Sequence, residues 1–110
     1  MAELDKANSG AEAQIETSSD SSGTPTVAVR GDLDMSNADA LKQAVASIAA
    51  DKPDALIIDF SGLRFMDSAG IAVLVDAANR VPQVRLRHPS AAVRRVIEIT
   101  GLTAIIVMEP

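Results

Sequence analysis

The feature that most constrains this chain is an alternation between short strand-like runs and segments with helical periodicity. Residues 55–60 (A-L-I-I-D-F) form a nearly continuous apolar run, which is typical of a central strand covered on both faces. Before it, residues 37–50 repeat apolar side chains such as Leu41 and Val45 at helical spacing, and after it residues 69–79 are apolar almost all round. This alternation predicts an α/β fold whose parallel strands are joined by right-handed helical crossovers.

Four further runs are predicted to be strands. The segment T-V-A-V-R at residues 26–30 alternates and is rich in β-branched residues, and Gly31 is expected to end it. Residues 84–88 alternate apolar with polar or basic side chains, so one side of that strand should face water. A short edge strand at residues 13–17 and a last strand at residues 104–108 complete a mixed, mostly parallel β-sheet that begins with one hairpin.

Serine and glycine residues mark the expected ends of three helices. Ser36 has an acidic residue three positions on, as in a capping box, and is expected to begin the first helix. A loop at residues 61–67 leads to Ser68, the predicted N-cap of the second helix. Ser90 is the predicted N-cap of the third helix, and Gly101 its C′ residue. The predicted element order is therefore β-β-α-β-α-β-α-β.

The net charge of −5 is concentrated in the first part of the chain. Residues 1–24 hold one lysine against five acidic residues, whereas residues 25–110 hold nine basic against ten acidic residues. The first twelve residues also lack periodicity and have only Met1 and Leu4 as large apolar side chains, so they cannot bury enough surface to offset the entropy of ordering. We expect residues 1–12 to form an acidic disordered tail and residues 13–110 to form one nearly neutral domain.

Composition excludes several classes of protein. Scattered arginines and only two phenylalanines give neither the basic stripe nor the stacking platforms of a nucleic-acid-binding domain. The absence of cysteine excludes disulfides, thiolate zinc sites and a cysteine nucleophile. The sequence has neither a long apolar segment nor a signal-peptide pattern. We therefore expect a cytoplasmic protein that binds neither nucleic acid nor membranes.

No arrangement of residues predicts a cofactor, a metal site or catalysis. The glycines of the domain are isolated and form no phosphate-binding loop. Asp32 and Asp34 alternate near a strand end, where turn and capping roles are usual, and they lack further ligands for a metal. His88 stands alone, with no nucleophile–base pair or ligand spacing around it, so a surface or capping role is expected. The sequence therefore favours a binding module over an enzyme.

Three segments carry a resemblance to a known family. Residues 58–74 (I-D-F-S-G-L-R-F-M-D-S-A-G-I-A-V-L) contain a strand ending in Asp, a Phe-Met loop and Asp-Ser-x-Gly-Ile opening an apolar helix. Residues 31–34 (G-D-L-D) follow the second predicted strand, and residues 94–102 (R-R-V-I-E-I-T-G-L) precede the last one. In this order, across residues 13–110, the segments resemble the STAS domain of anti-sigma-factor antagonists. The resemblance implies a single STAS domain.

The resemblance also implies a phosphorylation site and a partner. In that family the serine directly after the Asp is phosphorylated by an anti-sigma factor that is also a serine kinase, and a phosphatase resets it. The corresponding residue here is Ser68, and the second serine often found in the motif is Ala69, which leaves one acceptor. The implied partner-binding edge comprises Asp32, Asp34, Ser36, Asn37, Asp67, Ser68 and Gly70.

A serine at the start of a helix suits a switch. Its hydroxyl lies at the surface beside backbone N–H groups that have no intrahelical partner. A phosphate there carries about −1.5 to −2 charges and interacts favourably with the helix N-terminus, so the domain should tolerate it. Across an interface the same charge should repel an acidic partner surface or be costly to desolvate against an apolar one. We therefore expect phosphorylation of Ser68 to release the anti-sigma factor without unfolding the domain.

Two alternatives to this switch remain at the level of sequence. Ser68 could serve only as an N-cap, a role compatible with phosphorylation and worth about 1 kcal/mol. The whole chain could instead be a non-phosphorylated STAS scaffold subunit of a larger transport or stress-sensing assembly. The intact Asp67-Ser68 pair favours the anti-sigma-factor antagonist.

The surroundings of the motif leave two further alternatives. Phe65 and Met66 could both point into the core, or they could offer an apolar contact to a partner. The family often continues into a further C-terminal helix, whereas this sequence ends at Pro110. The surface that such a helix covers is therefore expected to be exposed, or to be covered by something else.

Overall fold

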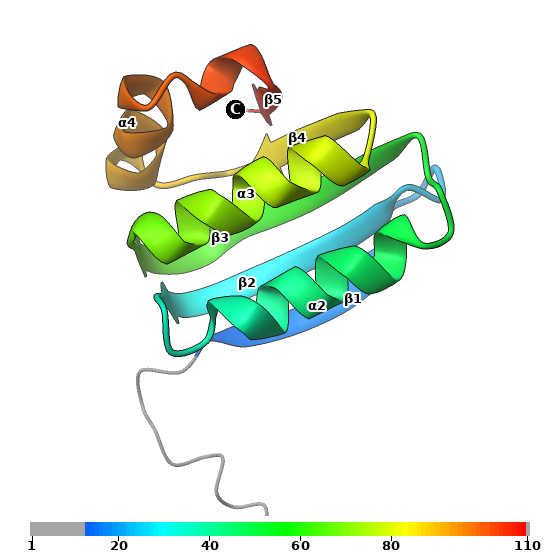
Figure 1. Cartoon of the computed structure of the whole chain (residues 1–110), viewed down its shortest axis with the longest axis horizontal. Coiled ribbons are helices and arrows are strands. Elements are labelled where there is room, and N and C mark those ends of the chain that lie inside the picture. The colour runs from blue at the N-terminus through cyan, green and yellow to red at the C-terminus, as the bar shows by residue number, and fades with distance from the viewer. Residues whose placement is uncertain (1–12, 110) are drawn as a thin grey trace, which may run out of the picture.

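Five strands form one sheet, and helices pack against it (Figure 1). The computed structural model describes residues 13–109. Along the chain the elements are β1 (Gln14–Ser19), β2 (Pro25–Leu33), α2 (Ala38–Ala49), β3 (Ala55–Met66), α3 (Ser68–Arg80), β4 (Gln83–Arg87), α4 (Ala91–Ile99), the 3₁₀ helix η1 (Leu102–Ala104) and β5 (Ile106–Glu109). The predicted α/β class and the predicted element order are confirmed.

The strands lie in the sheet in the order of the chain, β1-β2-β3-β4-β5. β1 and β2 form the antiparallel hairpin, and the remaining neighbours pair in parallel. β3 is therefore the central strand, as its apolar sequence predicts. Helices α2 and α3 lie side by side over one face of the sheet (Figure 1).

The core lies between this face of the sheet and the helices. Leu56, Ile58 and Phe60 alternate along β3, are fully buried and join one apolar cluster with the inner faces of α2, α3 and α4. The intervening Ile57 is only 1% exposed, but it lies outside this cluster, and Asp59 on the same side is partly exposed. The prediction that both faces of β3 are covered is therefore confirmed at Ile57 and wrong at Asp59.

Two strands are longer than the sequence predicts. β2 does not end at Gly31 but continues to Leu33, and β3 includes most of the predicted loop at residues 61–67. Gly31 has a φ of 93°, and the register between β2 and β3 shifts on either side of it. A glycine can adopt this left-handed conformation without steric cost, so the strand bends here and goes on pairing.

Other boundaries differ by a few residues. β1 covers Gln14–Ser19 instead of residues 13–17. The last strand, β5, covers Ile106–Glu109 instead of residues 104–108, because the 3₁₀ helix η1 occupies Leu102–Ala104. The third helix agrees with its prediction, because the Ser90 hydroxyl accepts a hydrogen bond from the Val93 amide at 3.2 Å. Gly101 follows it with a φ of 79°, in the left-handed conformation expected of a C′ glycine.

The predicted acidic tail, residues 1–12, lies outside the described residues. Within residues 13–109, no helix is long and apolar enough to cross a membrane.

Candidate functional site

The carboxyl ends of β2 and β3 meet at one edge of the sheet, because these strands are parallel. Leu33 at the end of β2 pairs with Met66 at the end of β3. Just beyond them, the Asp67 amide donates a hydrogen bond to the Leu33 carbonyl oxygen at 3.1 Å. This bond joins the turn after β2 to the start of α3, two segments that are far apart in the sequence.

Asn37 holds the turn between β2 and α2. Its side-chain amide donates to the Asp32 carbonyl oxygen at 2.8 Å, and its side-chain oxygen accepts from the Asp34 amide at 3.0 Å. Asn37 is also the N-cap residue of α2 by position, although its side chain caps no helical N–H group. The predicted helix start at Ser36 is therefore wrong, because Ser36 and Asn37 both bond back into the turn.

The Asp34 carboxylate closes the same turn. Its Oδ1 accepts from the Ser36 hydroxyl at 2.6 Å and from the Ser36 amide at 2.9 Å. These two donors, the hydroxyl first, lower the pKa of Asp34 below its ordinary value because they stabilise the ionised carboxylate. The carboxylate is therefore fully charged at neutral pH, and its bonds with Ser36 are lost only as the pH falls through the lowered pKa.

Asp67, and not Ser68, is the N-cap of α3. Asp67 has extended backbone angles, and its Oδ1 accepts from the Ala69 amide at 2.8 Å. Ser68 is the first residue of the helix; it is exposed, and its hydroxyl makes no hydrogen bond within residues 13–109. The predicted N-cap was thus off by one residue, since Asp and Ser are both good capping residues and stand side by side. The Ser68 hydroxyl is consequently free of a capping role.

Removing the Asp67 carboxylate should destabilise the domain. We expect Asp67→Ala to lower the free energy of unfolding by about 0.5–2 kcal/mol, as for other helix N-caps. Ser68→Ala is the matched control and should change it much less, because that hydroxyl bonds to no described group. Urea unfolding of both variants measures the difference. An equal loss of stability in both variants would contradict the assignment of the cap to Asp67 alone.

Gly70 lets α3 approach the end of β3 closely. A Cβ atom built on Gly70 would lie 2.4 Å from the Met66 Cγ and 3.0 Å from the Leu33 Cδ2. Both neighbours are buried, so neither can move aside without disturbing the core. The role of Gly70 in this geometry is to seat the helix that begins at Ser68.

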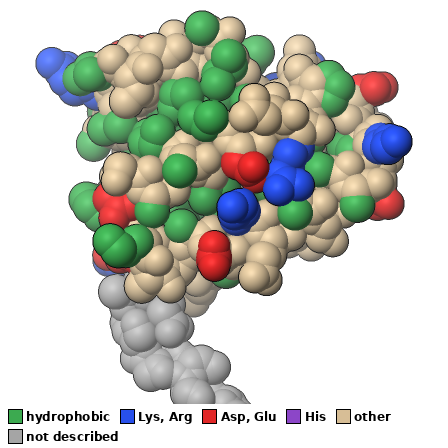
Figure 2. Space-filling view, in the orientation of Figure 1, with side chains coloured by type: hydrophobic (Ala, Val, Ile, Leu, Met, Phe, Trp, Pro, Cys, Tyr) green, Lys and Arg blue, Asp and Glu red, His purple; other side chains and the backbone are tan. Residues whose placement is uncertain are grey.

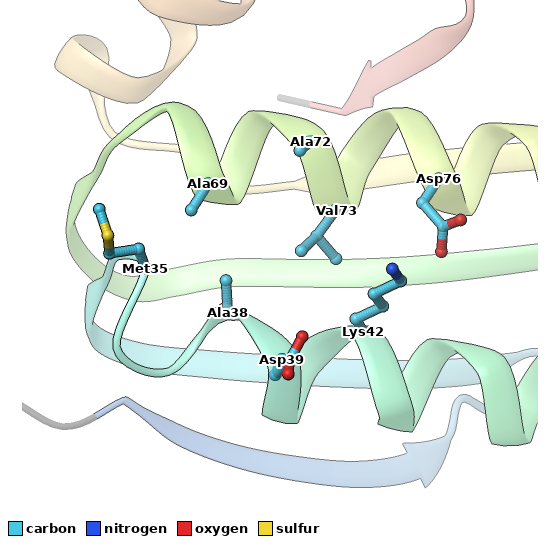
Figure 3. Close-up of a pocket in the computed structure, with 8 residues that line it drawn as sticks. All are labelled: Met35, Ala38, Asp39, Lys42, Ala69, Ala72, Val73 and Asp76. Carbon is cyan, nitrogen blue, oxygen red and sulfur yellow. The ribbon is translucent and has the colours of Figure 1, made fainter.

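A groove runs between α2 and α3 next to the turn after β2 (Figure 3). Its volume is about 250 Å³, and it is lined by Met35, Ala38, Asp39, Lys42, Ala69, Ala72, Val73 and Asp76. Met35 is 81% exposed at one end of the groove. Lys42 points from α2 toward α3, and Asp76 points from α3 toward α2. The groove thus offers an apolar floor with charged groups of both signs at its sides.

The sequence did not point to Met35 as a functional residue, and it left the orientation of Phe65 and Met66 open. The only signal for Met35 was a large apolar side chain in an otherwise polar turn, Asp34-Met35-Ser36-Asn37. Of the pair before Asp67, Met66 points into the core, whereas Phe65 is 52% exposed. The alternative that both residues point into the core is therefore wrong for Phe65, and an apolar contact of Phe65 with a partner stays a prediction.

The structure brings most of the predicted edge together and adds one basic residue to it. Asp32, in β2, forms an ion pair with the Arg64 guanidinium at 3.3 Å.

His88, for which a surface or capping role is expected, is exposed after β4 with a φ of 55°. Over residues 13–109, no cluster of three or more potential metal ligands occurs. The described residues of this edge are therefore held together by hydrogen bonds and one ion pair, and not by a cluster of metal ligands.

Comparison with protein families identifies the family of this chain. The family model described as "Mlab, STAS domain" matches residues 17–108. The anti-sigma-F factor antagonist RsfB of Mycobacterium tuberculosis is 30% identical over 89 residues, which cover 78% of this chain and 73% of RsfB. This chain belongs to the STAS-domain family of anti-sigma-factor antagonists. The resemblance carried by residues 31–34, 58–74 and 94–102 is thereby confirmed.

Solved structures agree with this STAS fold. An anti-sigma factor antagonist from Mycobacterium paratuberculosis superposes with a TM-score of 0.83 at 30% identity, covering 93% of this chain and 89% of that chain. The anti-sigma factor antagonist SpoIIAA in its unphosphorylated form has a TM-score of 0.75 at 20% identity, with coverage of 88% and 89%. At that identity, the second likeness shows the shared fold.

Proposed function

We propose that this STAS domain is an anti-sigma-factor antagonist that binds an anti-sigma factor with serine kinase activity. Binding sequesters the kinase and frees its sigma factor, and phosphorylation of Ser68 ends the binding. A phosphatase restores the unphosphorylated form, and the exchange takes place in the cytoplasm. In this exchange the domain is a substrate and has no enzymatic activity of its own.

The observation that carries this proposal is the position of Ser68. Its side chain is exposed at the first residue of α3, whereas the neighbouring Asp67 supplies the helix cap. A kinase can therefore reach the hydroxyl without first breaking a hydrogen bond within the described chain. The relatives named above, RsfB and the mycobacterial structure, are described as anti-sigma factor antagonists, which supports the same class of partner.

The surroundings of Ser68 suggest how the partner docks. The groove between α2 and α3 has an apolar floor of Ala69, Ala72 and Val73, and exposed Met35 lies at its end. We expect an apolar element of the anti-sigma factor to enter this groove. The turn between β2 and α2, which Asn37 holds, would then contact the anti-sigma factor beside Ser68.

Phosphorylation should act mainly across the interface. A kinase holds the phosphates of its nucleotide where the Ser68 hydroxyl enters, so the phosphoserine product faces an anionic site. Close charge pairs interact with energies of about 4 kcal/mol at an effective dielectric near 20. Within the domain, the new charge lies at a helix N-terminus, where it is favourable by about 0.3–1 kcal/mol. The interface is therefore weakened while the fold is retained.

The test is a phosphotransfer assay with candidate anti-sigma factors from the same organism and ATP. We expect at least one of them to place a single phosphate on the wild-type chain and none on Ser68→Ala. Mass spectrometry of the intact protein and of its peptides identifies the modified residue. If every candidate leaves Ser68 unmodified, the domain acts instead as a scaffold subunit and the proposal is wrong.

A further inference from the structure

A second apolar surface lies beyond the Ser68 site, between the end of β3 and α4. Phe65 is 52% exposed and faces a cavity of about 210 Å³. The cavity is lined by Arg64, Phe65, Met66, Ala92, Val93 and Val96. An exposed aromatic side chain beside a preformed apolar hollow is the arrangement in which a partner side chain can be buried.

Helix α4 extends this surface along its outer side. Ala92, Val96 and Ile99 follow at spacings of four and three residues, so they form one stripe on the helix. Ala92 is exposed and Ile99 is 74% exposed, whereas Val93 and Ile97 of the same helix turn into the core. Figure 2 shows apolar side chains gathered around α4 and along the neighbouring side of α3. We call Phe65, Ala92, Val96 and Ile99 the α4 patch.

Basic side chains border the α4 patch. Arg64 lines the cavity beside Phe65, and its side chain is 68% exposed, so its guanidinium has N–H donors left for a partner carboxylate beside its ion pair with Asp32. Arg95 is exposed on α4, one turn from Ala92 and Ile99, and forms no ion pair with any residue between 13 and 109. The groove between α2 and α3 is bordered differently, by the acidic Asp39 and Asp76 together with Lys42. A partner surface that carries charge of one sign therefore cannot complement both the α4 patch and the groove between α2 and α3.

We propose that the α4 patch is a second docking surface, and that it takes an acidic amphipathic segment of a partner protein. Apolar side chains of the segment fill the cavity at Phe65 and cover Val96 and Ile99. Carboxylates beside them pair with Arg64 and Arg95. This is the helix-in-groove mode of recognition, with specificity set by charges at the rim. Ser68 is not among the residues that line this cavity, and we expect the segment to bind whether or not Ser68 is phosphorylated.

The charges also argue against a second copy of this chain as the occupant. A symmetric contact between two α4 patches would bring the same basic rim, Arg64 and Arg95, against itself. Like charges facing each other across an interface are unfavourable and suppress such pairing. An acidic segment meets no such penalty.

The test uses a synthetic amphipathic helical peptide with leucines on one face and glutamates elsewhere. Two-dimensional amide NMR spectra of the full-length chain are recorded as the peptide is added, for wild type and for Ser68→Glu. We expect shifts centred on Phe65 and α4 in both proteins. A control peptide, with lysine in place of each glutamate, should bind at least roughly tenfold more weakly, because it meets Arg64 and Arg95.

Matched variants test the apolar and the basic side chains of this surface separately. Ile99→Ser should weaken binding of the acidic peptide roughly tenfold, whereas Val107→Ser, which alters another exposed aliphatic residue, on β5, should leave that binding unchanged. Arg95→Glu should reduce binding several-fold, and Lys52→Glu, an exposed charge elsewhere, should have little effect.

Four results would each overturn the proposal. The peptide could give no shifts at millimolar concentration, or shifts that map to the groove between α2 and α3, or equal binding by the acidic and basic peptides. Shifts at α4 that appear on raising the protein concentration alone would identify a second copy as the occupant, against the proposal.

Discussion

Replacing Ser68 by glutamate is expected to weaken binding of the anti-sigma factor about a hundredfold. Such a change requires about 3 kcal/mol of unfavourable interaction, which is less than one close charge pair supplies at an effective dielectric near 20. Ser68→Ala removes no bond within the described chain and should bind nearly as tightly as wild type, without accepting phosphate. Isothermal titration calorimetry with the partner identified in the phosphotransfer assay measures both.

Two controls make this result specific. Ser47→Glu introduces the same charge on an exposed residue of α2, close to the far end of that helix, and should leave the affinity unchanged. Thermal unfolding of Ser68→Glu should match that of wild type, because a carboxylate is tolerated at the start of α3. Tight binding by a folded Ser68→Glu variant would contradict the proposed switch.

The largest effect on stability is expected from Phe60→Ala. Phe60 is fully buried at the centre of β3, and truncating such a side chain costs about 3–5 kcal/mol. In a domain of about 100 residues, each kcal/mol lowers Tm by roughly 4–8 °C. The variant should therefore be extensively destabilised, which circular dichroism during heating or urea titration can measure.

The chain contains its own control for this experiment. Phe65 is the second of the two phenylalanines and is 52% exposed at the end of the same strand. We expect Phe65→Ala to change the free energy of unfolding by less than about 1 kcal/mol, since much of the ring already contacts water. Similar losses in both variants would mean that Phe65 contributes to the core as Phe60 does.

The kinds of element and their order could be predicted because each depends on local periodicity. The six-residue run at 55–60 and the stripe through Leu41 and Val45 are strong signals, and both appear in the structure as β3 and α2. The ends of β2 and β3 could not be predicted, because polar residues there are held in strand conformation by pairing with each other. Gly31 bends β2 without ending it, and only the register of the two strands reveals this.

The candidate site was predictable in its residues and less so in its contacts. The motif around Ser68 stands out in the sequence, but Asp67 and Ser68 are both suitable caps. The backbone angles of Asp67 and the hydrogen bond from the Ala69 amide to its carboxylate decide between them. Met35 and the groove between α2 and α3 depend on how two helices pack side by side, which no local pattern records. The same holds for the opposite orientations of Phe65 and Met66.

The hydrogen bond between the Asp67 amide and the Leu33 carbonyl oxygen has a consequence for quality control in the cell. Ser68 is present in every newly made chain, folded or not, but the turn at Asp34 lies beside it only after β2 and β3 have paired. Under the proposed function, a kinase that recognises the turn and the serine together would modify only chains that have completed this pairing. Misfolded copies would then neither capture the kinase nor consume its ATP.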